Sequence, residues 1–127
     1  MPEVTLLYAG LLGLLAVAVA FPAGRLRGST GISVGDGGNA DLLLAMRRHG
    51  NFAESVPILL ILIGLLEMNE VGTTAIHAMG ASLVLFRIAH AMGLKQDISN
   101  PLRAIGAGGT ALLTVVASIW AVYAAIT

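Results

Sequence analysis

Two long apolar segments lie at the two ends of the chain. Residues Val4 to Gly24 include no charged side chain, and neither do residues Ala104 to Thr127. A helix rises about 1.5 Å per residue, so each segment is long enough to cross a hydrocarbon layer of roughly 30 Å. Between them, the uncharged stretches 55–66 and 71–86 are shorter than the ~20 residues that a span needs. Two central helices are therefore expected to carry polar residues into the membrane.

This pattern predicts an all-α integral membrane protein, a four-helix bundle that forms one domain over residues 1–127. The helices are expected at about 4–24, 40–68, 72–93 and 101–126. Asn39 or Asp41 is expected to cap the second helix, and Ser99-Asn100-Pro101 is a cap followed by a proline at the first helical position. The first helix follows an acidic start, Met1-Pro2-Glu3, so we interpret it as a retained span and not as a signal peptide.

The basic residues are distributed asymmetrically along this predicted topology. All seven fall in or beside the first and third connections, whereas the second connection offers only Glu67 and Glu70. The seven are Arg25, Arg27, Arg47, Arg48, Arg87, Lys95 and Arg103. Because cytoplasmic loops carry an excess of Lys and Arg, we expect both basic connections to face the cytoplasm. Both termini are then on the non-cytoplasmic side.

Composition narrows the possible functions. The chain is 57% hydrophobic and only 11% charged, and its formal net charge is zero. No basic cluster backed by aromatic residues is present, so nucleic acid is not an expected partner. There is no cysteine, so any sulfur chemistry needs a thiol supplied by a ligand. The spacing of His49, His77 and His90 matches no local metal motif, and we expect no metal site.

Polar residues in the second helix form one stripe. Arg47, Asn51 and Glu54 are spaced i, i+4, i+7 and therefore share one helix face. Exposing a charge at the centre of the bilayer costs about 2.5–3.5 kcal/mol, so the stripe is expected to face the bundle, a neighbouring subunit or a wet pocket. Arg87 and His90 form a similar pair on the third helix.

Two interpretations of these residues remain open. In the first, the arginines anchor at the lipid interface and Glu54 pairs with one arginine to fix helix packing. In the second, the polar residues, with Arg103 in the first turn of the fourth helix, bind a small ligand with several anionic groups and an ammonium. His77 lies off this face, and we expect it to hydrogen-bond between helices.

At these residues the chain resembles the MAPEG family, membrane-associated proteins in eicosanoid and glutathione metabolism, and especially its small bacterial branch. The bacterial pattern G-D-G-G-N is present as Gly35 to Asn39. After a short spacer comes R-x-H-x-N-F-x-E-x-x-P, which here spans Arg47 to Pro57, with Arg48 at the variable second position. Phe86-Arg87-Ile88-Ala89-His90 and Pro101-Leu102-Arg103 are similar to the family's elements on the third and fourth helices.

The resemblance implies a homotrimer in a bacterial inner membrane, with glutathione as co-substrate between neighbouring subunits near the cytoplasmic side. Carried over by position, the ligand-binding residues are Arg47, His49, Asn51, Glu54, Arg87 and His90, with Arg25 as a further candidate. Arg103 would face the sulfur as the catalytic residue. The implied activity is that of a glutathione-dependent transferase or peroxidase acting on small lipophilic electrophiles or hydroperoxides that arrive with membrane lipid.

Other functions stay open beside this one. Eukaryotic members often have a tyrosine and a hydroxyl residue where this chain has Leu94 and Ala104, so two polar contacts are absent here. The family also includes a non-catalytic member, and a lipid-binding or scaffolding protein of the same fold is the main alternative. A channel for small solutes is a third alternative, since polar residues inside a bundle can line a path.

Overall fold

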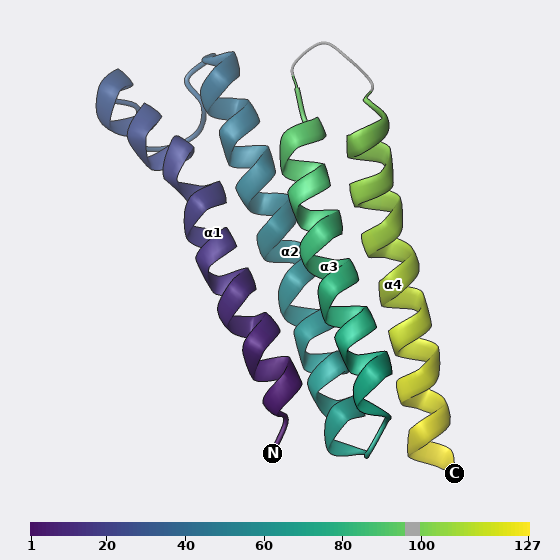
Figure 1. The fold of residues 1–127 in the computed structure, drawn as a ribbon. Helices are drawn as coiled ribbons and strands as arrows, with labels where there is room; N and C mark the ends of the chain where they lie inside the picture. The colour runs from purple at the N-terminus through teal and green to yellow at the C-terminus, as the bar shows by residue number, and fades with distance from the viewer. Residues whose placement is uncertain (96–99) are drawn as a thin grey trace.

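Four helices form an antiparallel bundle in the computed structural model, which describes residues 1–95 and 100–127 (Figure 1). They are α1 (Glu3–Thr30), α2 (Ala40–Met68), α3 (Thr73–Gly93) and α4 (Pro101–Ile126). All four are long and apolar enough to cross a membrane, which confirms the predicted all-α membrane fold. Both termini lie at one end of the bundle, and the α1–α2 connection lies at the other (Figure 1). We call this other end the loop end.

The first helix is longer than the sequence pattern suggested. We expected it to stop near Gly24, but α1 continues to Thr30. It ends where Gly31 adopts a left-handed conformation, with φ of 70°, and donates its amide N–H to the carbonyl of Arg27. The basic residues of this region therefore lie on the last turns of a helix and not in a loop.

Side-chain caps define where α2 and α4 begin. The side chain of Asn39 accepts a hydrogen bond of 2.9 Å from the N–H of Leu42, and Asn100 accepts one of 2.8 Å from the N–H of Leu102. Both helices begin where we predicted, at residues 40 and 101. Ser99, the other residue proposed for the α4 cap, lies outside the described residues.

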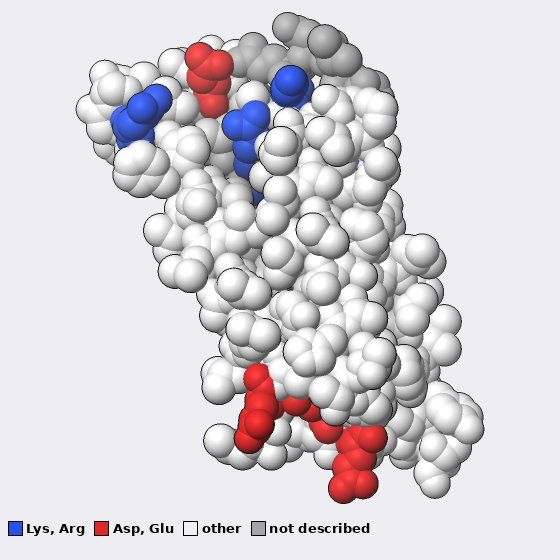
Figure 2. Space-filling model, viewed as in Figure 1, with Lys and Arg blue, Asp and Glu red and all other residues white. Residues whose placement is uncertain are grey.

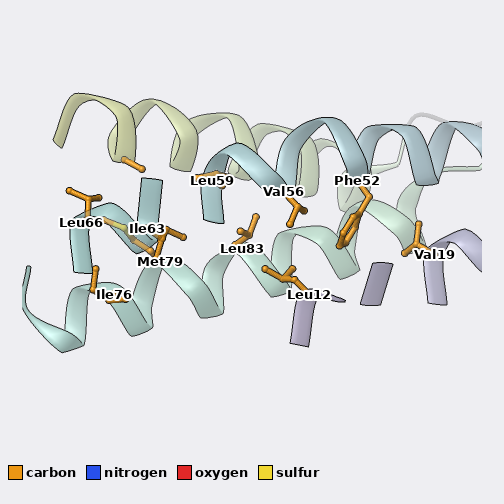
Figure 3. Close-up of a cluster of buried hydrophobic side chains, with 11 residues drawn as sticks. Leu12, Val19, Phe52, Val56, Leu59, Ile63, Leu66, Ile76, Met79 and Leu83 are labelled. Carbon is orange, nitrogen blue, oxygen red and sulfur yellow. The ribbon is translucent and has the colours of Figure 1, made fainter. Parts of the chain in front are cut away.

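The largest apolar core runs between α1, α2 and α3, with α4 contributing Ala117 (Figure 3). Its largest fully buried members are Leu12, Leu59, Ile63, Leu66, Ile76 and Leu83. In contrast, large apolar side chains of α1 and α4, such as Leu14 and Ile119, are exposed on the outside of the single chain. In a membrane protein this surface faces lipid or another subunit.

Small residues allow α3 and α4 to pack at short distance. A Cβ added at Gly93 would lie 2.7 Å from the carbonyl carbon of Leu102 and would also overlap the backbone of Arg103. A Cβ at Gly106 would lie 2.6 Å from the carbonyl oxygen of Phe86. The obstacles are backbone atoms, which cannot rotate away. Both glycines are therefore required for this helix contact, as expected for packing without a hydrophobic driving force.

Helix α1 contacts α3 through Tyr8 and His77. The Tyr8 hydroxyl and His77 Nδ1 are 3.0 Å apart, so the expected helix-to-helix hydrogen bond of His77 is confirmed. Gly80 makes room for this arrangement, because a Cβ there would lie 2.6 Å from Cε2 of the Tyr8 ring.

On the face shown in Figure 2, the charged side chains lie toward the two ends of the bundle, with a belt of uncharged residues between them. Basic side chains gather toward the loop end, and a group of acidic side chains lies at the end that carries the termini (Figure 2). This distribution places the basic connections and the termini on opposite sides of the membrane.

Glu67 in the last turn of α2 caps the beginning of α1. Its Oε1 accepts a hydrogen bond of 2.8 Å from the N–H of Val4, and its Oε2 accepts one of 2.7 Å from the N–H of Thr5. Pro2, at the capping position itself, makes no side-chain cap. A carboxylate from another helix therefore satisfies two of the free N–H groups at the α1 N-terminus and complements its dipole.

Replacing Glu67 by glutamine should destabilise the protein by about 0.5–2 kcal/mol, since one of the two acceptors and the negative charge are lost. Thermal unfolding in detergent measures the loss, and hydrogen exchange should be faster at the amides of Val4 and Thr5. The matched control is Glu70→Gln, which removes an acidic charge at the same end from a side chain that makes no hydrogen bond to α1. Equal effects of the two substitutions would contradict the capping role.

Candidate functional site

A cleft of about 680 Å³ lies between α2, α3 and α4 toward the loop end. Its volume is within the range of roughly 300–1,000 Å³ that is typical of small-molecule sites. The lining residues are Leu43, Met46, Arg47, Gly50, Asn51, Glu54, His90, Leu94 and Arg103. Five of them are candidates from the sequence, so the structure brings together polar residues of three helices that are up to 56 positions apart (Arg47 to Arg103).

The α3–α4 packing sets the position of two of these side chains. Gly93 admits the backbone of Arg103, and Gly106 admits the backbone of His90. His90 is buried, and its Nδ1 has no hydrogen-bond partner among the described residues. The imidazole therefore keeps unused hydrogen-bonding capacity at the wall of the cleft.

The cations and the carboxylate of the cleft are not paired with one another. Within residues 1–95 and 100–127, the side chains of Arg47, Glu54 and Arg103 have no hydrogen-bond or ion-pair partner, and all three are exposed. The internal Glu54–arginine pair, which the sequence left open, does not form in the single chain. Glu54 lies about 20 Å along α2 from its first residue, so this exposed, unpaired carboxylate is near the middle of the helix.

Arg87 does not line this cleft but lines an adjoining pocket, which shares Asn51 and Glu54 with the cleft. It is 1% exposed, and its Nη2 donates a 2.7 Å hydrogen bond to Oδ1 of Asn51, while Nη1 donates one of 3.4 Å to Oγ1 of Thr110. Its guanidinium carbon also lies 5.8 Å from the centre of the Phe52 ring, a cation–π distance. Arg87 thereby fixes the orientation of Asn51, whose side chain faces the cleft.

Two residues from the sequence-based set lie away from the cleft. His49 is exposed on α2 and does not line it. Arg25 lies on the extended part of α1, beside a separate hollow formed with Val17, Ala20, Phe21 and Gly24. Within one subunit, neither residue reaches the group formed by Arg47, Glu54 and Arg103.

Sequence reasoning did not identify Thr110 and Arg48 as part of this region. The Thr110 hydroxyl donates a hydrogen bond of 2.7 Å to the carbonyl of Gly106. Threonine commonly makes this bond in helices, so the sequence did not indicate that Thr110 contacts Arg87. Arg48 was indistinguishable from the other basic residues. Its guanidinium donates from Nε and Nη2 to the carbonyl of Leu94, with 3.1 Å from Nε, and so ties α2 to the end of α3.

The chain matches the family model for the MAPEG family over residues 5–123. It is also 36% identical to the protein named inner membrane protein YecN of Escherichia coli (strain K12), over 92% of this chain and 91% of that protein. The protein of the same name from Escherichia coli O6:H1 (strain CFT073) matches equally well. No solved structure matches the chain.

These relatives and the four spanning helices confirm the predicted location, a multi-pass protein of a bacterial inner membrane. The match covers all four helices and every residue of the cleft. The chain belongs to the MAPEG family of integral membrane proteins.

Proposed function

We propose that this protein binds glutathione in the cleft and uses it as a transferase or peroxidase on lipophilic electrophiles or hydroperoxides. The observation that carries this proposal is the set of unpaired charges around the cleft, with two arginines and one glutamate. Glutathione has two carboxylates and one ammonium, so its charges complement this set. Arginine binds carboxylates in a two-pronged geometry, and Glu54 is the partner for the ammonium.

The exposure of Glu54 supports a site that a second subunit completes. An unpaired carboxylate on the outside of the bundle is costly at this depth in the membrane. A homotrimer, in which a neighbouring subunit covers the cleft, would remove Glu54 from lipid and hold the ligand between subunits. Arg25 and His49, which do not reach the cleft of their own chain, are the candidates for contacts across such an interface.

Arg103 is the residue that we propose stabilises the thiolate. A free thiol has a pKa near ~8.5, and a nearby guanidinium lowers it, so more of the nucleophilic form is present at neutral pH. In the transferase reaction the sulfur forms a bond to an electrophilic carbon, and the leaving group departs with its bonding electrons. In the peroxidase reaction two thiols become one disulfide, and the hydroperoxide becomes an alcohol and water.

Glutathione should raise the melting temperature of the detergent-purified protein. A ligand at ten times its Kd adds about 1.4 kcal/mol of stability, which corresponds to a rise of several degrees. Glu54→Gln keeps the side-chain volume but removes the partner of the ammonium, so the rise should be much smaller in this variant. Glu70→Gln, which removes an acidic charge at the opposite end, is the matched control and should keep the full rise.

The absence of any shift at several millimolar glutathione would overturn the proposal. If lipids shift the melting temperature and no electrophile is turned over with any thiol, the non-catalytic lipid-binding protein is the better description.

A tripeptide with alanine in place of the cysteine of glutathione should raise the melting temperature of the wild type almost as much as glutathione does. The reason is that the cleft binds the carboxylates and the ammonium, which both peptides carry.

A further inference from the structure

A separate pocket, of about 370 Å³, opens at the loop end and shares Leu43, Arg47, Leu94 and Arg103 with the cleft. Three of its lining residues are basic: Arg47, Lys95 and Arg103. The others are apolar, namely Ala40, Leu43, Leu44 and Leu94. None of the described residues that line this pocket is acidic.

Two backbone contacts bring these three cations together from different helices. The close approach of Gly93 to the backbone of Arg103 sets the beginning of α4 against the end of α3. Arg48, which follows Arg47 on α2, donates from its guanidinium to the carbonyl of Leu94. Since Leu94 precedes Lys95, this contact brings Lys95 close to Arg47. The cations are thus gathered by the packing of the helix ends.

A group of three like charges without a counter-ion is unfavourable at a membrane surface, where part of the surroundings is apolar. Neither Arg47 nor Lys95 nor Arg103 has an anionic partner in the described parts of the chain. The electrostatics therefore favour an anion in this pocket. The oxygens of a phosphate group are good acceptors for guanidinium and ammonium donors.

We propose that this pocket binds the phosphate of an anionic phospholipid. A lipid headgroup and a free phosphate ion both offer a negatively charged phosphate. The apolar side chains that α2 contributes to the pocket favour the lipid. Leu43 and Leu44 give a lipid's glycerol and upper acyl chains a surface to cover, whereas a free ion would leave this wall wet. The loop end also lies where headgroups are found, at the end of the belt of uncharged residues (Figure 2).

Bound lipid would also compete with glutathione, because Arg47 and Arg103 line both the pocket and the cleft. This second part of the inference rests on the proposed function, whereas lipid binding itself does not. Lys95 lines the pocket but not the cleft, so it distinguishes the two sites.

The test measures the melting temperature in neutral detergent micelles titrated with phosphatidylglycerol or, as the neutral counterpart, phosphatidylcholine. Phosphatidylglycerol should stabilise the wild type in a saturable manner, and Lys95→Gln should shift the midpoint of this titration about fivefold higher. Arg27→Gln removes one charge at the same end but outside the pocket, so its midpoint should stay within about twofold of the wild type. Equal midpoints for Lys95→Gln and the wild type, or equal stabilisation by both lipids, would overturn the proposal.

Two further arms separate the alternatives. Inorganic phosphate in neutral micelles should give no shift that depends on Lys95, and such a shift would overturn the choice of a lipid headgroup. Glutathione should bind the wild type several-fold more weakly with phosphatidylglycerol present, and this difference should shrink in Lys95→Gln. If glutathione never shifts the melting temperature while phosphatidylglycerol does, the proposed function fails and the lipid site stands.

Discussion

Replacing Gly106 by alanine is expected to destabilise the bundle by about 1–3 kcal/mol, the usual cost of overpacking a tight contact. The added Cβ would lie 2.6 Å from both the His90 Cβ and the carbonyl oxygen of Phe86. Helices α3 and α4 would have to separate to accept it. This loss should exceed the gain of about 1 kcal/mol that alanine brings over glycine in a helix.

Gly108→Ala is the matched control on the same helix. A Cβ at Gly108 meets no atom within 4 Å, so only the propensity gain applies and the stability should be unchanged or higher. Unfolding titrations of both variants in the same mixed micelles measure the difference directly. A Gly106→Ala protein as stable as Gly108→Ala would show that α3 and α4 do not pack as closely as described.

The contrast between these two glycines shows where prediction from sequence ends. Both lie in the same run of small residues, Gly106 to Gly109, and a span rich in glycine is expected at a helix contact. The existence of the first and fourth helices followed from the length of their apolar runs alone. Which glycine touches a neighbour depends on the rotation of α4 about its axis, and no pattern within α4 specifies that angle.

The same limit applies to the candidate site. The i, i+4, i+7 spacing placed Arg47, Asn51 and Glu54 on one face, and all three line the cleft. Spacing within a helix does not show which polar residue turns inward, so Arg87 was grouped with the cleft residues although it is buried, bonds to Asn51 and lines the adjoining pocket. The end of α1 was misjudged for a related reason, since the cap at Gly31 follows a stretch of mixed polar residues without periodicity.

In the proposed glutathione-dependent reaction, Arg103→Ala should lower kcat/KM by about 10²-fold or more at neutral pH. This is the scale at which the loss of an electrostatic stabiliser affects catalysis. The fold should survive, because Arg103 is exposed and its side chain has no partner among the described residues. Without the guanidinium, the pKa of bound glutathione should return toward ~8.5, so the rate should recover as the pH is raised. The rate and the absorbance of the bound thiolate are both measured as a function of pH. These profiles separate a role in thiolate stabilisation from a structural role.

Two variants complete this experiment. Arg103→Lys keeps the positive charge without the planar guanidinium, so its pH profile should lie between those of the wild type and Arg103→Ala. Lys95→Gln removes a cation at the same end of the bundle and outside the cleft, and in neutral micelles it should keep turnover within about twofold. If Lys95→Gln and Arg103→Ala both lose turnover with unchanged pH profiles, Arg103 contributes only to the overall positive charge of the loop end and does not stabilise the thiolate.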